Sequence, residues 1–234
     1  MLRLIKVKAS YGKVGVLWDV SLEINEGELI TLVGANGAGK TTMLKTISGL
    51  VHPCSGSVEF LKQRIDRIMP HQIVEMGISH VPEGGKCFPD MTVRENLEMG
   101  AYLYKTWKQR ETILENVYQM FPILQTREKQ LARTLSGGER QMLAMGRSLM
   151  AKPRLCMFDE PSYGLAPQIV IQIFEFVKML HRQKITVFIV EQEVKNALEL
   201  ADRAYVLENG RIVLEGSSET LLRHDHIKKA YLGL

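Results

Sequence analysis

The chain has 234 residues, of which 45% are hydrophobic and 24% charged, a composition typical of globular proteins. Its 30 basic and 26 acidic residues leave a net charge of +4, which is too small and too dispersed to indicate nucleic-acid binding. The longest apolar run, residues 185–190, is far too short to cross a bilayer.

The start of the chain and its cysteines indicate the compartment. The sequence does not begin with the charged stretch and apolar block of a secretory signal, so we expect the protein to stay on the side of the membrane where it is made. Cys54, Cys87 and Cys156 are odd in number and follow neither zinc nor disulfide spacing, which fits a reducing compartment. Cys156 lies in an apolar run and is predicted to be core.

Residues 16–24 alternate between apolar and other side chains, the pattern of a half-buried β-strand. The positions predicted to share the apolar face are Val16, Trp18, Val20, Leu22 and Ile24. Together with residues 2–9, this strand predicts an antiparallel sheet at the N-terminus, extended by residues 57–60.

Residues 34–41 form the phosphate-loop pattern of Gly, four residues, then Gly-Lys-Thr. The apolar run 29–33 before it predicts a buried strand, and residues 42–47 after it a helix that stops near Gly49. Strand, glycine-rich turn and helix start aim backbone N–H groups and the positive end of the helix dipole at one anion. A merely flexible glycine turn would leave Lys40 unexplained, so we predict binding of a nucleoside triphosphate. The residues assigned to it are Gly34, Asn36, Gly37, Ala38, Gly39, Lys40, Thr41 and Thr42.

Two of these side chains have distinct predicted roles. Lys40 is placed to reach the outer phosphates and assist catalysis, and the Thr41 hydroxyl to ligate Mg²⁺.

After a short strand at 78–81, residues 92–150 have almost no strand character. Helices are predicted near 92–103, 107–120 and 139–150, with breaks at Pro122 and around residues 136–138. This segment is interpreted as a helical insertion.

The helix that follows residue 135 has a special start, Leu-Ser-Gly-Gly-Glu. Ser136 and Glu139 fit a capping box, which explains the serine as a helix cap worth about 1 kcal/mol. A cap alone does not require Gly137 and Gly138, whereas two positions without side chains let an anion approach the backbone. A second phosphate-binding surface is therefore predicted here.

Asp159 and Glu160 follow the apolar run 155–158, which predicts a strand covered on both faces. Ligands of open α/β sheets bind at the C-terminal edge of the strands, although a polar strand end that simply meets solvent is also common. With the phosphate loop in the same chain, Asp159 is predicted to hold Mg²⁺ with Thr41, and Glu160 to polarise the attacking water.

The remaining elements complete the predicted fold. Helices near 169–180 and 194–200 alternate with a strand at 185–190, and residues 203–208 and 211–215 form a hairpin around Asn-Gly. We predict an α/β phosphate-loop core with a mostly parallel sheet, an N-terminal antiparallel β part and the helical insertion. One domain is expected over residues 1–234, with 91–150 as the helical subdomain and 1–90 and 151–234 as the α/β core.

The phosphate loop, Leu-Ser-Gly-Gly-Glu and Asp159-Glu160 occur in the order found in the ATP-binding subunits of ATP-binding-cassette (ABC) transporters, which the chain resembles over its whole length. The resemblance implies a head-to-tail dimer in which Ser136, Gly137 and Gly138 of one subunit cap the ATP held by the other. It also implies that Tyr11 stacks on adenine.

Three positions differ from the general family pattern. Glu83 replaces a glutamine, Ala166 an aspartate, and Gln192 the switch histidine. By resemblance, Glu83 belongs to the metal site, with Thr41 and Asp159. Gln192 is assigned a catalytic role, in which it donates an amide N–H to the γ-phosphate in place of histidine. One interpretation is a slow, decayed ATPase.

The other interpretation, which we favour, is a subfamily that works with these residues. Four short motifs resemble those of the ATP-binding subunit of branched-chain amino acid importers: Val-Pro-Glu-Gly at 81–84, Gly-Leu-Ala-Pro at 164–167, Val-Glu-Gln at 190–192 and Ala-Tyr-Leu-Gly at 230–233. Gly85-Lys86 departs from the two basic residues usual in that subfamily.

The resemblance implies an ATPase with ATP and Mg²⁺, attached peripherally to the cytoplasmic face of the cell membrane. Its implied partners are membrane permease subunits, a second ATP-binding subunit (a copy or a paralogue) and, indirectly, an extracytoplasmic solute-binding protein, with no nucleic acid. The permease contact is expected near residues 83–90 and the helical insertion, where Phe88 is either an anchor or a core residue.

Several alternatives stay open at this point. A lipopolysaccharide or amide transporter would use the same motifs. A soluble ABC protein acting on DNA or ribosomes typically has coiled coils or tandem cassettes, and this sequence shows no heptad run. A nucleotide-gated interaction module without hydrolysis would give the three departures another meaning.

Overall fold

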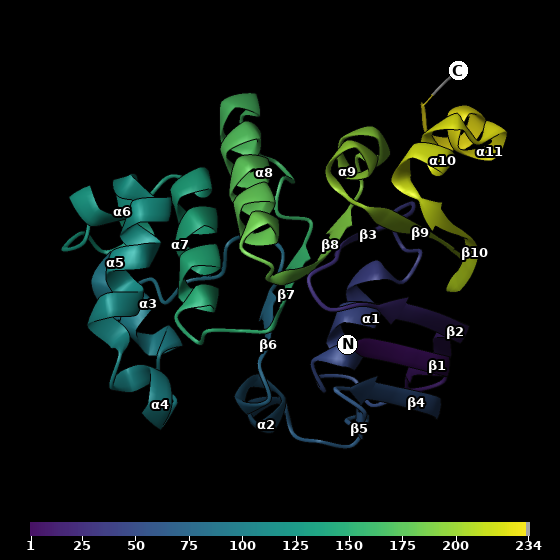
Figure 1. Ribbon diagram of the computed structural model, residues 1–234, viewed down its shortest axis with the longest axis horizontal. Helices are drawn as coiled ribbons and strands as arrows, with labels where there is room; N and C mark the ends of the chain where they lie inside the picture. The colour runs from purple at the N-terminus through teal and green to yellow at the C-terminus, as the bar shows by residue number, and fades with distance from the viewer. Residues whose placement is uncertain (233–234) are drawn as a thin grey trace.

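The computed structural model describes residues 1–232, and its strands form one sheet of six strands and one of four (Figure 1). The strands of the large sheet are β3 (Leu29–Val33), β6 (Ile78–Val81), β7 (Leu155–Asp159), β8 (Thr186–Glu191), β9 (Arg203–Glu208) and β10 (Arg211–Ser217). Their order is β10-β9-β3-β8-β7-β6, and every neighbouring pair is parallel except β9 and β10. The predicted mostly parallel core is confirmed.

The central strands are buried on both faces, as their continuous apolar runs predict. In β7, Cys156 and Phe158 pack into the cluster formed with the helical insertion, and Leu155 and Met157 into the cluster formed with the N-terminal sheet. Cys156 is therefore a core residue, as predicted. The first cluster joins the helices of 93–150 to the sheet without interruption.

The small antiparallel sheet contains β1 (Leu2–Tyr11), β2 (Val14–Ile24), β4 (Ser55–Phe60) and β5 (Gln63–Arg64). The predicted alternation along β2 is correct from Val20 onward and wrong before it. Leu17 is 1% exposed, whereas Trp18 is 42% exposed. The reason is an irregularity at Asp19, whose φ is 53°. It shifts the alternation by one residue, so odd-numbered side chains face the core before Asp19 and even-numbered ones after it.

Five α-helices fill residues 93–149, where three were predicted. They are α3 (Val93–Gly100), α4 (Tyr104–Trp107), α5 (Arg110–Met120), α6 (Pro122–Thr126) and α7 (Gly137–Leu149). Pro122 does end α5, but it also begins α6, because the first helical position needs no backbone N–H. Gly100 ends α3 where a Cβ would overlap the Arg147 carbonyl oxygen of α7, so the two helices approach closely there.

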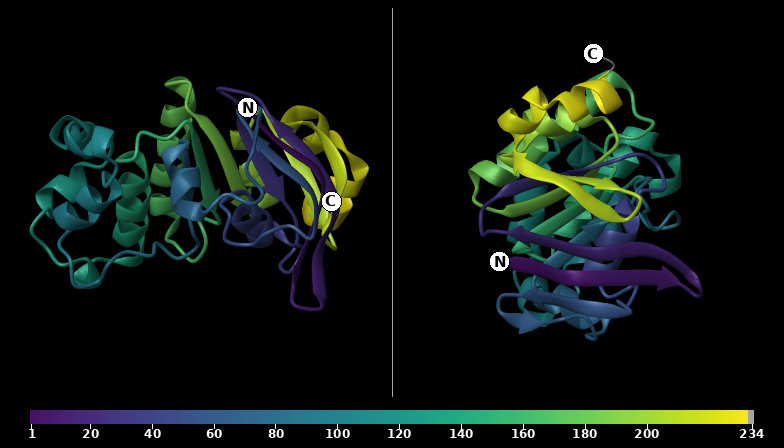
Figure 2. Two further views of the ribbon diagram at one scale, coloured as in Figure 1. Left: turned by 90° about the horizontal axis from the view of Figure 1, so that it is seen from below. Right: turned by 90° about the vertical axis from the view of Figure 1, so that its right-hand side faces the viewer.

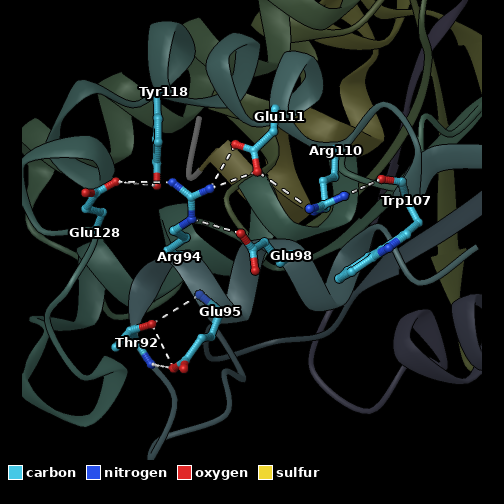
Figure 3. Close-up of polar contacts among 9 residues, drawn as sticks. All are labelled: Thr92, Arg94, Glu95, Glu98, Trp107, Arg110, Glu111, Tyr118 and Glu128. Atoms are coloured by element: carbon cyan, nitrogen blue, oxygen red, sulfur yellow. Dashed lines mark hydrogen bonds and ion pairs between the residues drawn. The ribbon is translucent and has the colours of Figure 1, made fainter.

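A network around Arg94 holds these helices together (Figure 3). Its guanidinium donates to Glu98 within α3 at 2.8 Å and to both carboxylate oxygens of Glu111 in α5 at 2.8 and 2.9 Å. The Glu128 carboxylate, which follows α6, lies 3.9 Å from the same guanidinium and accepts a bond from the Tyr118 hydroxyl. A single arginine thus links three segments of the helical insertion.

The other helices are α1 (Lys40–Ile47), α2 (Pro70–Glu75), α8 (Pro167–Arg182), α9 (Val194–Leu200), α10 (Ser218–Arg223) and α11 (Asp225–Ile227). The chain then continues through a π-helical turn over Lys228–Leu232. Gly233 of the predicted Ala-Tyr-Leu-Gly motif lies outside the described residues.

The Asn209-Gly210 hairpin joins the two sheets, whose strands lie side by side in Figure 2. Both residues have positive φ, 48° and 74°, as the predicted tight turn requires. The Gly210 carbonyl accepts from Trp18 N of β2 at 2.8 Å, and Gly210 N donates to the Ala38 carbonyl at 2.9 Å. The turn therefore braces the loop between β3 and α1.

Candidate active site

The glycines of the 34–41 loop each have a structural reason. Gly37 and Gly39 adopt φ of 80° and 108°, a region that side chains disfavour. A Cβ on Gly34 would overlap the carbonyl oxygen of Leu207 in β9. Glycine thus lets the loop follow this path without backbone strain at Gly37 and Gly39 and without steric overlap at Gly34.

The N-cap residue of helix α1 is Gly39, which has no side chain that could accept a hydrogen bond from the first turn. The backbone N–H groups of the first turn and the positive end of the helix dipole therefore face the adjoining cleft. That cleft has a volume of about 360 Å³ and is lined by Val16, Asn36, Gly37, Gly39, Lys40, Thr41, Thr42, Glu83, Glu160 and Tyr163. Its lining includes six of the eight predicted phosphate-loop residues; Gly34 and Ala38 shape the loop from behind.

Lys40 connects this loop to Glu160. Its side chain is 4% exposed, and its ammonium lies 2.8 Å from the Gly34 carbonyl, 3.2 Å from the Ala35 carbonyl and 3.1 Å from the Glu160 carboxylate. A phosphate that enters the cleft competes with these three oxygens for the lysine. Phosphate binding and release of the Glu160 side chain are thereby coupled.

Thr41 and Asp159 meet from two different elements. The Thr41 hydroxyl at the start of α1 donates to Asp159 Oδ1 at the end of β7, at 3.2 Å. Burial raises the pKa of Asp159 to about 6, with contributions in the same direction from the negative charges of Glu160 and Glu83. The hydrogen bond from Thr41 lowers the pKa but does not offset the effect of burial.

These oxygens fit Mg²⁺, a cation that takes one or two protein ligands and completes its shell with phosphates and water. Within residues 1–232, no group of three or more His, Cys, Asp or Glu could hold a metal by protein ligands alone. A divalent cation between Thr41 and Asp159 would also neutralise the negative charge of the buried Asp159 carboxylate, whose ionised form the nearby charges of Glu83 and Glu160 disfavour.

Tyr11 and Gln192 are among the predicted site residues that do not line this cleft. Tyr11 is 48% exposed at the end of β1, beside the turn to β2, and Val16 of β2 lines the cleft instead. Gln192 lines a neighbouring groove of about 940 Å³, shared with Ser162 and Tyr163. Tyr163 borders both spaces, so Gln192 adjoins the cleft rather than facing into it.

The predicted capping box at 136–139 is confirmed. Glu139 N donates to the Ser136 hydroxyl at 3.3 Å, and Ser136 N donates to the Glu139 carboxylate at 2.8 Å. Packing also requires glycine at position 138, because a Cβ there would lie 2.7 Å from Ile169 Cγ2 of α8. Gly137 is exposed, and a Cβ there would meet only Leu165, at 3.7 Å. Among the described residues that line the nucleotide cleft, none comes from α7.

Glu191 lines the groove next to the cleft and was not among the residues predicted from the sequence. It ends β8, is 2% exposed, and accepts bonds from the backbone N–H and hydroxyl of Ser162, at 3.3 and 2.8 Å. Burial, with the nearby charge of Glu160, raises its pKa to about 7. A carboxylate directly after the apolar run 185–190 was the available signal, parallel to that of Asp159.

The site combines a glycine-rich loop that can bind an anion, the start of a helix, a lysine, a threonine and two acidic residues at the C-terminal edge of a parallel sheet. This combination defines a phosphate-loop nucleoside triphosphatase. Residues 17–163 match the ABC transporter family. The chain belongs to this family, and as a member it is an ATPase.

Several curated proteins are similar to this chain over nearly its whole length. The chain is 47% identical to the high-affinity branched-chain amino acid transport ATP-binding protein BraG of Pseudomonas aeruginosa, covering 100% of both chains. It is 38% identical to the probable branched-chain amino acid transport ATP-binding protein LivF of Archaeoglobus fulgidus, covering 100% of this chain and 99% of LivF. Its identity to the lipopolysaccharide export ATP-binding protein LptB of Haemophilus influenzae is 33%, over 96% and 93% of the two chains.

The fold agrees with a solved cassette. The ADP conformation of MJ1267, an ATP-binding cassette of an ABC transporter, superposes with a TM-score of 0.86 at 27% identity, covering 100% of this chain and 99% of that one.

Proposed function

We propose that the chain is the ATP-hydrolysing subunit of a membrane importer that carries branched-chain amino acids. The observation that carries the ATPase part is the convergence of Lys40, Thr41, Asp159 and Glu160 at one sheet edge. The full-length similarity to BraG and LivF supports the cargo. Within residues 1–232, no helix is both long and apolar enough to span a bilayer. The proposed translocation path lies in permease subunits, as the names of BraG and LivF as ATP-binding proteins of transport systems suggest.

In the proposed mechanism, the phosphate loop and Lys40 would hold the triphosphate. Thr41, Asp159 and Glu83 would form the Mg²⁺ site. When bound, Mg²⁺ would neutralise phosphate charge. The phosphate-bound Lys40 leaves Glu160, whose carboxylate then orients the attacking water. Catalysis is positioning and charge stabilisation, without a covalent intermediate.

The second half of each site comes from another subunit, a copy of this chain or a paralogue. Ser136, Gly137 and Gly138 would cap the nucleotide held by the partner, with Gln192 donating an amide N–H and Tyr11 stacking on the base. The absence of α7 from the described lining of the chain's own cleft supports this assignment. Closing and reopening of the dimer would then move the permease.

The permease is proposed to dock beside Glu83 and the helical insertion, on the cytoplasmic face of the membrane. A second cleft of about 680 Å³ extends from the proposed Mg²⁺ site at Thr41 and Asp159 to this surface, where Leu50 and Lys86 line it. Leu50 is 60% exposed and Phe88 46% exposed, with the Arg147 guanidinium 4.9 Å from the Phe88 ring centroid. Phe88 is thus an exposed residue and not a core one, which supports the anchor interpretation.

Two neighbouring alanine variants test the cap on the partner's nucleotide. Gly137→Ala has room and should leave Tm unchanged, yet lower ATP turnover by about 10-fold or more, because the added methyl group blocks the approaching phosphate. Gly138→Ala is the matched control for packing: overlap with Ile169 should lower stability by about 1–3 kcal/mol. Thermal melts and steady-state turnover measure both. Unchanged turnover in Gly137→Ala would contradict the assignment.

Reconstitution tests the function as a whole. Proteoliposomes that contain the subunit with its permease and binding protein should accumulate radiolabelled leucine, isoleucine or valine when MgATP is supplied to the side of this subunit, and Lys40→Ala should abolish accumulation. ATP turnover without uptake of these amino acids would refute the cargo and redirect the search to amides or lipopolysaccharide, as in LptB. Absence of turnover in the complete complex would refute the ATPase and favour a nucleotide-gated interaction module.

A further inference from the structure

The buried carboxylate of Glu191 connects two loops that flank the active site. Glu191 is the last residue of β8, and Gln192 follows it directly. Ser162, which donates two hydrogen bonds to Glu191, lies two residues after Glu160 in the loop that follows β7. One side chain therefore joins the strand end that carries Gln192 to the turn that carries Glu160.

The turn at Glu160 needs such support. Glu160 has φ of 44°, a left-handed conformation that costs free energy for any residue with a Cβ and persists only where the surroundings hold it. Its N–H donates to the Val190 carbonyl of β8 at 2.9 Å, and its carbonyl accepts from Tyr163 N at 3.1 Å. The two hydrogen bonds from Ser162 to the Glu191 side chain also attach this turn to β8.

Stability alone does not account for a carboxylate at this position. Glu191 is almost completely removed from water and lies near the negative charge of Glu160, and both effects disfavour its ionised form. A buried charge held mainly by two hydrogen bonds from a serine is costly compared with an uncharged side chain of the same shape. Such residues are concentrated at functional sites.

Given the ATPase function proposed above, we infer that Glu191 is a positioning residue: through Ser162 it holds the strained turn of Glu160 in the geometry that hydrolysis requires, and it couples that turn to Gln192. It touches neither the nucleotide nor the attacking water. Its removal should therefore lower kcat while leaving ATP binding in place.

The test compares Glu191→Ala, Glu191→Gln, Ser162→Ala and the double variant Glu191→Ala/Ser162→Ala. Glu191→Ala should lower kcat by about 10- to 100-fold, because the free energy lost with buried hydrogen bonds to a charged acceptor corresponds to a rate change of that size. KM should stay within about twofold of the wild-type value. Ser162→Ala should give a smaller loss in kcat, and the double variant no more than Glu191→Ala, because both changes break one attachment. Glu191→Gln should recover most of kcat, since its amide oxygen accepts from Ser162 N and its NH₂ donates to the Ser162 hydroxyl.

Asp66→Ala is the control for general destabilisation. Asp66 is another buried carboxylate, 4% exposed, which accepts from Arg64 Nε at 2.7 Å and from Val58 N in the antiparallel sheet. Its loss should lower Tm and leave kcat within about twofold.

Three results would overturn the inference: kcat retained within about twofold in Glu191→Ala, losses that multiply in the double variant, or an equal loss of kcat in Asp66→Ala. If Glu191→Ala does not fold, an unchanged kcat in Ser162→Ala overturns it. A wild-type protein without ATP turnover would instead refute the proposed function itself, so the two failures are distinguishable.

Discussion

Glu160→Gln is expected to lower steady-state ATP turnover by at least about 100-fold and to trap an ATP-bound dimer. The amide is nearly the same size as the carboxylate and can still accept a hydrogen bond from Lys40, which lies 3.1 Å from Glu160 in the wild type. It cannot take a proton from water, so the nucleotide that closes the dimer is not consumed. Turnover assays and size-exclusion chromatography with light scattering, both with saturating MgATP, measure the two effects.

The double variant Lys40→Ala/Glu160→Gln provides the control. Without the lysine the triphosphate loses its main cationic partner, so the double variant should remain monomeric with MgATP. A Glu160→Gln variant that hydrolyses ATP near the wild-type rate would refute the role of Glu160. One that stays monomeric while it binds ATP would count against self-pairing and point to a paralogue as the partner.

Asp159→Asn is expected to separate stability from catalysis. Turnover should fall by about 100-fold or more, because the amide is a poor ligand for Mg²⁺ compared with a carboxylate. The free protein, in contrast, should become more stable at pH 8, by roughly 1–3 kcal/mol or a few degrees in Tm. The Thr41 hydroxyl, 3.2 Å away, can still donate to the amide oxygen.

The sign of the stability change follows from the pKa of Asp159, which is raised from 3.8 to about 6 in the fold. Below the unfolded value both states carry the proton and the carboxyl has no net effect on stability. As the pH rises toward the folded value, the unfolded chain ionises first, so the native state loses stability; above it the full penalty remains. Asparagine removes this penalty.

Thermal melts in EDTA at pH 8 and pH 4 test the effect. The gain of Asp159→Asn over the wild type should be clear at pH 8 and small at pH 4. An equal gain at both values would exclude ionisation of Asp159 as the cause. Saturating MgATP should stabilise the wild type more than the variant, because ligand binding to the native state adds to its stability.

Local sequence determined the elements and the chemistry of the phosphate loop. Buried strands at 29–33 and 155–158, the turn at Asn209-Gly210 and the capping box at Ser136 each depend on residues that are close in the chain. Periodicity and turn chemistry act over such short spans, and the resemblance of ordered motifs then identified the family.

Tertiary structure alone decided which side chains meet. The strand order β3-β8-β7 brings Glu191 beside Ser162 and the Glu160 turn, and the folded loop brings Lys40 to Glu160. Helix α8 explains Gly138, and the irregularity at Asp19 turns Trp18 outward. These contacts join residues far apart in sequence, so they depend on register and packing between elements, which no local pattern encodes.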